Sequence, residues 1–450
     1  MQNRNTTAAG DEPAGTPLSG DALEAVLVAE LGDVLVTRAA DIDPRYFTAY
    51  NEPAGARPRA LVRPRSVDDV SRTLALCARL GQTVVPQGGL TGLARGAVAL
   101  GGEVVLSMER FAGVEALDAA AGTMTVRAGT PLQTVQEAAE AAGFTFGVDL
   151  GARGSCQIGG MLATNAGGTR AIRYGMMREQ VLGLEAVLAD GTVVSSMNRM
   201  LKNNAGYDLK QLFIGSEGTL GVVTRAVLRL HPLLAAPATA LCRVRDYDAV
   251  IALWNRVRTL PEVVSFEAMW PAFYDYVARR TPGVSAPFVG DDGFAALIEC
   301  ATSAPRGDAH QARDLWTLRE GLAIDALPHL VNFDVSLPTG ELGVFAERCE
   351  AALRMQWPDA VCLFFGHVGD GNVHIGVSLA GMSDADADAL DHCVYAVVRD
   401  MGGSVSAEHG IGVLKRPYLA HTRSDAEIGL MRRLKAALDP GGILNPGKVL

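Results

Sequence analysis

Clustered cysteines, basic patches and long apolar runs are all missing from this chain of 450 residues. The seven cysteines are scattered and form no CxxC pair, which argues against an iron–sulfur cluster or a disulfide framework and suits reduced thiols in a cytosol. A formal net charge of -10, with no run of Lys and Arg interleaved with aromatics, argues against nucleic acid as a partner. No stretch approaches roughly 18 consecutive apolar residues, so no membrane span is expected. We expect a cytoplasmic protein, and docking at the periphery of a membrane stays open.

The composition is that of a globular protein, with 48% hydrophobic and 20% charged residues, and the length allows two to three domains. The first 20 residues are rich in Ala, Gly, Thr and Pro and lack an apolar signal core. Leu234 to Ala240, with Pro237 among them, look like a domain boundary. The expected organisation is a disordered leader (1–20), an N-terminal helical segment (21–56), a first domain (57–233), a second domain (234–409) and a C-terminal segment (410–450).

The two domains differ in their predicted elements. In the first, Ser66 followed by acidic residues predicts an N-capped helix that ends near Gly81, with a strand at Thr83–Val85 behind it. After Thr239, strand-like and helical patterns alternate. This alternation favours an α+β sandwich in which helices cover one face of an antiparallel sheet.

A glycine-dense turn follows the strand at Thr83–Val85 and runs from Pro86 to Leu93. Its glycines at 88, 89 and 92 allow close approach to the backbone, and consecutive amide N–H groups can form a nest for an anion, with the Thr91 hydroxyl as a further donor. The spacing is not GxGxxG, so a nicotinamide site of the Rossmann type is disfavoured. The alternative is a glycine-rich turn without a ligand.

A second glycine-dense stretch strengthens the case for a cofactor. Residues 151–168 hold six glycines, among them the pairs Gly159-Gly160 and Gly167-Gly168. Small residues let a flat ring system or a ribityl chain lie against the backbone. The alternative is core packing, which needs fewer glycines. The two stretches together indicate a dinucleotide-type cofactor.

Histidines and acids gather much later in the chain. His367 and His374 flank a Gly-Asp-Gly-Asn turn, so a hairpin there would bring both imidazoles to one side. With Glu408 as third ligand, they form a His₂-carboxylate set with open positions, which suits a divalent metal acting as a Lewis acid. His409 stays free as a base, and Asp370 is expected to stabilise the turn. Zinc is the expected ion, and manganese or iron would tolerate the same ligands.

At this point several strings, in order, resemble the family of FAD-linked D-2-hydroxyacid dehydrogenases, whose members include D-lactate dehydrogenases, the glycolate oxidase FAD subunit and D-2-hydroxyglutarate dehydrogenases. Beside the two glycine-rich stretches, these strings are Leu150–Cys156, Asn204–Leu209, Phe213–Gly221 and Gly442–Lys448. The resemblance runs from about Arg57 to Leu450. It implies an α+β protein: a two-subdomain FAD-binding fold of the vanillyl-alcohol-oxidase/PCMH type, an α+β cap with an antiparallel sheet, and a C-terminal segment that returns to the FAD-binding domain.

The resemblance also implies roles for residues. His367, His374 and Glu408 would bind the metal, and His409 would take the hydroxyl proton beside the flavin, which receives the C2 hydrogen as hydride. The family usually holds FAD without a covalent bond, and Cys156 is the one candidate here for attachment. The residues expected to line FAD are Pro86, Gln87, Gly88, Gly89, Leu90, Thr91, Gly92, Leu93, Leu150, Gly151, Gly154, Ser155, Cys156, Ile158, Gly159, Gly160, Asn165, Ala166, Gly167, Glu217, Gly218, Gly221, Val222 and Asn445.

Around the substrate this chain departs from its relatives. Arg319 matches a family arginine that grips a substrate carboxylate, with a salt bridge to a nearby acid as the alternative. Ala323 stands where the 2-hydroxyglutarate enzymes have a threonine, Asn332 where they have a lysine, and Gly376 where they have an asparagine. We expect Arg319 and Asn332 to face the substrate. The loss of a cation and two polar groups favours a D-lactate-like, monocarboxylic acid, with D-2-hydroxyglutarate as the alternative.

Two further hypotheses assign the chain a different chemistry. A non-redox FAD enzyme, like the related ether-lipid synthases, would not need the metal set, and retention of His409 argues against a noncatalytic flavin subunit of an oxidase complex. The sequence leaves open the electron acceptor, which is an electron-transfer flavoprotein, a quinone, a cytochrome or oxygen, and it leaves open a homodimer. The remaining histidines, His231 among them, are expected to serve surface or core roles.

Overall fold

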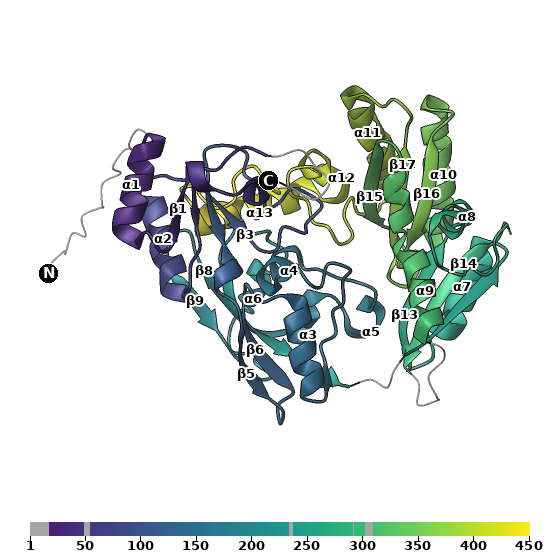
Figure 1. The fold of residues 1–450 in the computed structure, drawn as a ribbon, viewed down its shortest axis with the longest axis horizontal. Coiled ribbons are helices and arrows are strands. Elements are labelled where there is room, and N and C mark those ends of the chain that lie inside the picture. Colours follow the sequence, from purple (N-terminus) through teal and green to yellow (C-terminus); the bar gives the residue numbers. More distant parts are fainter. Residues whose placement is uncertain (1–17, 49–54, 234–236, 291, 302–308) are drawn as a thin grey trace, which may run out of the picture.

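The computed structural model describes residues 18–48, 55–233, 237–290, 292–301 and 309–450. Two bodies lie side by side (Figure 1). The first domain contains the described residues up to 233 together with the C-terminal helix α13 (Asp425–Leu438). The cap domain contains the described residues from 237 to the end of α12 (Leu419–Thr422). The predicted leader, 1–20, lies outside the described residues as far as residue 17.

The first domain contains a mixed four-stranded sheet, a five-stranded antiparallel sheet and a two-stranded ribbon. In sheet order the strands are β1 (Val36–Arg38), β2 (Ala60–Val62), β4 (Val104–Ser107) and β3 (Val84–Gln87); β5 (Val114–Asp118), β6 (Thr123–Arg127), β10 (Val222–Arg229), β8 (Val181–Val187) and β9 (Val193–Ser196); and β11 (His231–Pro232) with β7 (Phe144–Thr145). The helices are α1 (Gly20–Leu31), α2 (Val67–Arg79), α3 (Leu132–Ala141), α4 (Ile158–Thr164), α5 (Ala171–Tyr174) and α6 (Lys210–Phe213).

Local signals account for the start of this domain. Ser66 caps α2 as predicted, because its hydroxyl accepts the backbone N–H of Asp69. β3 follows and runs parallel to β4, so the turn from Gly88 onward leaves the carboxyl end of a parallel strand, where ligands of open α/β sheets bind. The helical prediction for 21–56 holds for α1 but misses β1, which adds an antiparallel edge strand to β2.

His231 stands at the end of the first domain in a setting that predicts acid sensitivity. Its Nε2 pairs with Gln180 Oε1 at 2.8 Å, and its ring lies 4.6 Å from that of Tyr174. Burial, followed by the charges of Arg229 and Arg173, lowers the pKa of His231 to about 4. The unfolded chain therefore binds this proton near pH 6.5, whereas the folded chain does not until about pH 4.

The expected consequence is a loss of stability between these two pH values. The stabilisation from neutral His231 is fully present above pH 6.5 and declines as the pH falls towards 4. A His231→Gln variant has no proton to take up, so the stability difference between the wild type and the variant should shrink across that window. Thermal unfolding of both FAD-saturated proteins at several pH values measures this, and a constant difference would contradict it.

The cap domain is built on one six-stranded sheet in which every neighbouring pair of strands is antiparallel, as predicted. In sheet order the strands are β12 (Pro237–Val244), β14 (Phe294–Ala301), β13 (Val263–Met269), β16 (Val361–Gly366), β17 (Asn372–Ser378) and β15 (Leu330–Ser336). The helices are α7 (Tyr247–Val257), α8 (Pro271–Arg280), α9 (Ala309–Glu320), α10 (Leu342–Gln356), α11 (Asp384–Asp400) and α12 (Leu419–Thr422).

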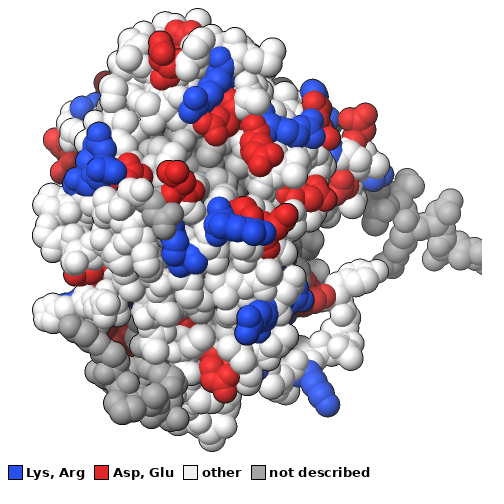
Figure 2. Space-filling view, turned by 90° about the vertical axis from the view of Figure 1, so that its right-hand side faces the viewer, with Lys and Arg blue, Asp and Glu red and all other residues white. Residues whose placement is uncertain are grey.

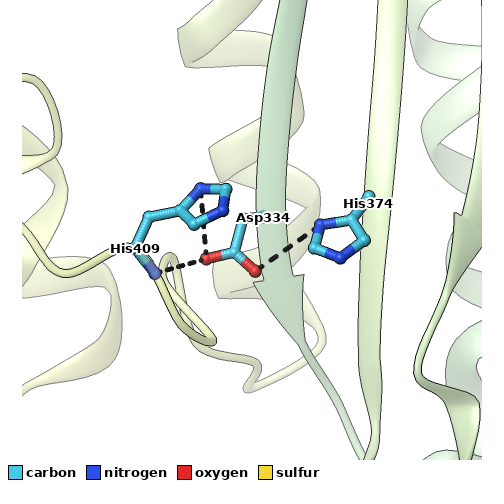
Figure 3. Close-up of side chains that lie close together, drawn as sticks. All are labelled: Asp334, His374 and His409. Atoms are coloured by element: carbon cyan, nitrogen blue, oxygen red, sulfur yellow. Dashed lines mark hydrogen bonds and ion pairs between the residues drawn. The ribbon is translucent and has the colours of Figure 1, made fainter. Parts of the chain in front are cut away.

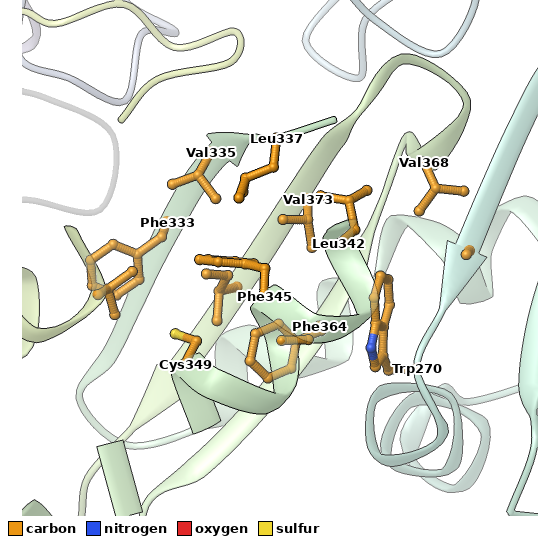
Figure 4. Packing of buried hydrophobic residues seen from close by; sticks show 14 of the residues in the cluster. Trp270, Phe333, Val335, Leu337, Leu342, Phe345, Cys349, Phe364, Val368 and Val373 are labelled. Carbon is orange, nitrogen blue, oxygen red and sulfur yellow. The ribbon is translucent and has the colours of Figure 1, made fainter. Parts of the chain in front are cut away.

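Helices cover both faces of this sheet, so the prediction of one covered face is wrong. On one face α7, α10 and α11 pack over a core that includes Phe364 and Phe345 (Figure 4). On the other face α8 and α9 pack against Leu363 and Phe365. Successive residues of β16 are thus buried on opposite faces, as in any strand whose residues are apolar without alternation. The core also holds Val368, which anchors the turn between His367 and His374.

Part of the segment predicted as a domain boundary, Leu234 to Ala240, belongs to the cap sheet. Residues 234–236 lie outside the described residues, but Pro237–Val244 form β12, which pairs along its length with β14. On the cap face shown in Figure 2, acidic and basic side chains intermingle over the described surface without a contiguous basic patch. Among the described residues, none of the helices combines the length and apolar character needed to cross a membrane.

Candidate active site

The β16–β17 hairpin brings His367 and His374 together as the sequence predicts. Their ring centroids lie 5.4 Å apart. The turn between them requires a glycine at 371, where φ is +86° and a Cβ would collide with the carbonyl oxygen of Leu337. Asp370 supports the turn by accepting the backbone N–H of Asn372 (3.3 Å). It is not part of the group of converging ligand atoms.

Glu408 joins the two histidines from a different part of the chain. Ligand atoms of His367, His374 and Glu408 all lie within 4.8 Å of one another. Nδ1 of His367 donates to the buried carboxylate of Glu267 (2.7 Å), which leaves its Nε2 on the side of Glu408, 3.9 Å from Oε2. A carboxylate on the far nitrogen is the usual way to orient a metal-binding imidazole.

The charge balance of this cluster fits a cation. Burial raises the pKa of Glu408 to about 7, since His367 offsets only part of that effect. Burial would lower the pKa of His367, but the carboxylates of Glu267 and Glu408 raise it to about 9. Two buried carboxylates therefore compete for one imidazole proton, and a divalent ion held by His367, His374 and Glu408 would neutralise them.

His409 lies beside this cluster and faces Asp334 (Figure 3). Its ring is nearly parallel to that of His374, with centroids 6.0 Å apart, and its Nδ1 is 3.6 Å from Asp334 Oδ2. Burial lowers the pKa of His409, although Asp334 opposes the shift. Asp334 is completely buried: burial would raise its pKa, but the charges of His409, Lys415 and His374 hold it well below 3.8. A neutral imidazole of this kind is suited to accept a proton.

The two glycine-rich stretches meet and form one cradle. A Cβ on Gly89 would collide with the carbonyl oxygen of Ser155, and a Cβ on Gly88 would stand 3.6 Å from the Cα of Gly160. Pro86 packs against a third stretch at Gly218. Part of the second stretch is helical, because Ile158–Thr164 form α4.

The other predicted cofactor residues lie on these same stretches. Pro86 and Gln87 end β3, and residues 88–93 form the turn behind it. Leu150, Gly151, Gly154 and Ser155 lie on the loop before α4, and Ile158, Gly159 and Gly160 are in its first turn. Asn165, Ala166 and Gly167 follow α4, while Glu217, Gly218, Gly221 and Val222 lead into β10. Asn445 lies behind α13, and its backbone N–H donates to Val84 (2.8 Å).

Orphaned polar atoms around the cradle fit a polar cofactor. The side-chain oxygens of Gln87, Gln157 and Asn445 are buried and make no hydrogen bond with any described residue. Such atoms are costly unless a ligand or water satisfies them. Burial raises the pKa of the Cys156 thiol to about 11, so it stays protonated and is a poor nucleophile for covalent attachment.

The cradle reaches the His/Glu cluster. A Cβ placed on Gly167 would stand 2.9 Å from Glu408 Oε1. The cofactor stretch of the first domain and the cluster of the cap domain are therefore adjacent, as hydride transfer between a substrate on the cluster and a ring system in the cradle requires.

Arg319 and Asn332 have different surroundings. The guanidinium of Arg319 is buried and pairs with Glu267 (Nε to Oε2, 2.7 Å), so the salt-bridge alternative is realised, and its Nη2 lies 3.4 Å from His367 Nδ1. Asn332 is exposed on β15, where it pairs with Gly376. It lies two residues from Asp334 on the same face of the sheet.

Asp334, Glu267 and Lys415 are functional candidates that motif reasoning missed. Asp334 lies two residues after Asn332, but no sequence pattern links it to His409, which is 75 residues away. Glu267 lies in a strand where every residue is buried. A charged residue inside an otherwise buried strand is the signal that points to it, since such a group needs a partner.

Both domains of the chain match families of known proteins. Residues 58–196 match the FAD binding domain family, and residues 299–449 match the C-terminal domain of FAD linked oxidases. The chain is 38% identical over 448 residues to a D-2-hydroxyglutarate dehydrogenase of Xanthomonas citri pv. viticola, covering 92% of this chain and 94% of that protein. It is 37% identical over 420 residues to the mitochondrial D-2-hydroxyglutarate dehydrogenase of Bos taurus, covering 87% of this chain and 77% of that protein.

A solved structure shares the fold. An alkyldihydroxyacetonephosphate synthase aligns with a TM-score of 0.66 at 18% identity, covering 86% of this chain and 76% of that one. The sequence relatives are similar enough, over enough of the chain, to decide the family. The protein belongs to the FAD-linked D-2-hydroxyacid dehydrogenases and is an FAD-binding oxidoreductase that acts on D-2-hydroxy acids.

Proposed function

We propose that the enzyme oxidises a monocarboxylic D-2-hydroxy acid with an apolar side chain, with His409 as the general base. His367, His374 and Glu408 would hold a divalent metal, with zinc the first choice because imidazole and carboxylate ligands suit it. The observation that carries the proposal is the convergence of these four side chains beside Gly167 of the FAD stretch. FAD is held without a covalent bond, and we place the enzyme in the cytoplasm.

The chain's own residues supply the orientation and the proton transfer. When bound, FAD would supply the acceptor for the hydride from C2, and a divalent metal held by His367, His374 and Glu408 would supply positive charge near the substrate. His409 takes the hydroxyl proton. Glu267 orients His367, and Arg319 holds Glu267 in place. The 2-oxo acid is the product.

The preference for an apolar side chain rests on the row of residues next to the cluster. Phe365, His374 and Asp334 pair across the sheet, and the next row on the same face is Leu363, Gly376 and Asn332. A Cβ on Gly376 would stand 3.3 Å from Leu330 Cδ1 and 3.4 Å from Ile324 Cδ1. This row contains no cation that could meet a second carboxylate.

A second candidate substrate, D-2-hydroxyglutarate, is favoured by the names of the relatives. The two candidates are separated by comparing kcat/KM for D-2-hydroxy acids with short apolar side chains and for D-2-hydroxyglutarate, with the metal-replete enzyme. We expect the apolar acids to be preferred. A higher kcat/KM for D-2-hydroxyglutarate would contradict the proposed substrate but not the reaction.

An Asn332→Lys variant tests the same point from the protein side. Asn332 is exposed, so a lysine fits without disturbing the core. A new charge-assisted hydrogen bond would raise kcat/KM for D-2-hydroxyglutarate by about 10-fold or more. An Asn332→Gln control, which adds length without charge, should leave the ratio between the substrates unchanged. The same gain in both variants would show that charge in this row does not select the substrate.

A further inference from the structure

The metal ligand Glu408 and the base His409 both lie on a short stretch that bridges the two domains. We call residues 407–412 the bridging segment. It follows α11 of the cap domain and precedes α12 and α13. Just before the segment, Ser404 exchanges two backbone hydrogen bonds with Ser336 at the end of β15 (2.7 and 3.1 Å). No residue of the segment belongs to a helix or strand, so other contacts must fix its path.

A buried carboxylate of the cap domain grips the first half of the segment. Oδ2 of Asp334 accepts the backbone N–H groups of Ala407, Glu408 and His409 at 3.2, 2.9 and 3.0 Å. Its Oδ1 accepts from Asn372 Nδ2 (2.7 Å), and Asn372 lies on the hairpin that carries the metal histidines. Asp334, which lies on β15, thus ties both the bridging segment and the β16–β17 hairpin to one carboxylate.

A buried carboxylate of the first domain grips the second half. The two oxygens of Glu217 accept the backbone N–H groups of Ile411 (2.7 Å) and Gly412 (2.8 Å). The backbone of Glu217 is itself fixed, because its carbonyl accepts from Asn445 Nδ2 (2.7 Å) and its N–H donates to Ala163 (2.8 Å). Its φ of +52° is uncommon for a residue other than glycine, and such strain persists only where surrounding contacts enforce it. The expected FAD-lining residue therefore directs its carboxylate at the bridging segment.

We propose that Asp334 and Glu217 are a pair of positioning residues that clamp the bridging segment from opposite domains. Asp334 sets the orientation of Glu408 and His409 relative to the metal histidines, and Glu217 sets the distance of the segment from the FAD cradle. The metal side and the flavin side of the site are thereby aligned by five backbone hydrogen bonds to two carboxylates. The proposal rests on the proposed function for its catalytic consequence, but the clamp itself does not.

The two halves of the clamp predict different defects. In Asp334→Ala the segment keeps its hydrogen bonds to Glu217 of the first domain but loses those that fix Glu408 and His409 beside the metal histidines. We expect Co²⁺ to bind the metal-free protein about 10–100-fold more weakly, with an altered visible spectrum, and flavin reduction to slow by about 100-fold. Asp334→Asn retains an acceptor oxygen for the three N–H groups and should recover most of both losses.

In Glu217→Gln the metal side stays intact. We expect normal Co²⁺ affinity and spectrum and an unchanged KM, with a kcat for flavin reduction about 10–100-fold lower, since a displacement near 1 Å is enough for such a loss. Hydrogen exchange of the amides of residues 407–409 should speed up only in Asp334→Ala, and that of residues 411–412 only in Glu217→Gln. A purely structural role would not divide the readouts in this way.

Glu103→Gln is the matched control. Glu103 is also a buried glutamate that accepts two consecutive backbone N–H groups, those of Leu100 and Gly101 (3.3 and 2.7 Å), neither of which belongs to the bridging segment. It should lower stability without changing the Co²⁺ spectrum or kcat. Unchanged Co²⁺ binding and exchange in Asp334→Ala, or the same defects in Glu103→Gln, would overturn the clamp. If the wild type is not reduced by any D-2-hydroxy acid, the proposed function fails, while the Co²⁺ and exchange readouts still decide the clamp.

Discussion

Replacing His409 with alanine should slow substrate-driven flavin reduction by about 10²–10⁴-fold, the range typical for the loss of a general acid–base group, while FAD stays bound. The ring centroid of His409 lies 6.0 Å from that of the proposed metal ligand His374, and burial lowers the pKa of His409, which favours the neutral form that accepts a proton. The side chain contacts Asp334 and His374 of the cap domain, so its loss should leave the FAD cradle intact. Stopped-flow absorbance under anaerobic conditions measures the rate, and the flavin content of the purified variant measures FAD binding.

His392→Ala is the control for this variant. His392 lies on α11, is exposed, and pairs with Tyr418 and the backbone of Asp388. Its loss should leave the rate of flavin reduction unchanged. Near-normal reduction in His409→Ala would remove this residue from the proton transfer, whatever the result for the metal.

If His367, His374 and Glu408 hold the proposed metal, its removal should abolish flavin reduction in the wild type. A divalent ion there would lower the pKa of the substrate hydroxyl, so without it His409 should fail to take the proton. His367→Ala should bind less than about a tenth of the metal per protein under the conditions that saturate the wild type, and should be inactive for the same reason. Metal content by mass spectrometry and the rate of flavin reduction measure the two effects.

Restoration distinguishes metal loss from damage. Adding Zn²⁺ or Mn²⁺ to the chelated wild type should recover reduction, whereas His367→Ala should not recover. The flavin spectrum should remain that of bound FAD throughout, because the cradle lies on the first domain. Full reduction by a metal-free protein would contradict the role assigned to His367, His374 and Glu408.

Local signals predicted much of the fold. The N-cap at Ser66 and the glycine-rich turn after β3 depend only on residues that are neighbours in the sequence. The hairpin that carries His367 and His374 likewise depends on one short turn. The burial of β16 on both faces was predicted wrongly, although its apolar residues do not alternate and so carried the signal. The helix α4 was missed because Gly159 and Gly160 in its first turn have low helix propensity, which the tertiary contacts of the cradle outweigh.

Long-range contacts could not be read from the sequence. Asp334 and the segment it grips are more than 70 residues apart, and Glu217 and Ile411 more than 190. No sequence motif with a fixed spacing predicts either contact. Arg319 shows the same limit: its match to a substrate-binding arginine is clear in the sequence, but its partner Glu267 becomes visible only when β13 and α9 are placed side by side.

The most direct test of metal-assisted oxidation is anaerobic mixing of the metal-replete enzyme with the D and L forms of 2-hydroxy acids, followed by the flavin absorbance, before and after chelation. Rapid bleaching by D-acids alone, lost on chelation and regained with added metal, is the expected result. Bleaching that is indifferent to chelation, or equal for both enantiomers, would contradict a site in which the metal cluster and His409 select and deprotonate the substrate.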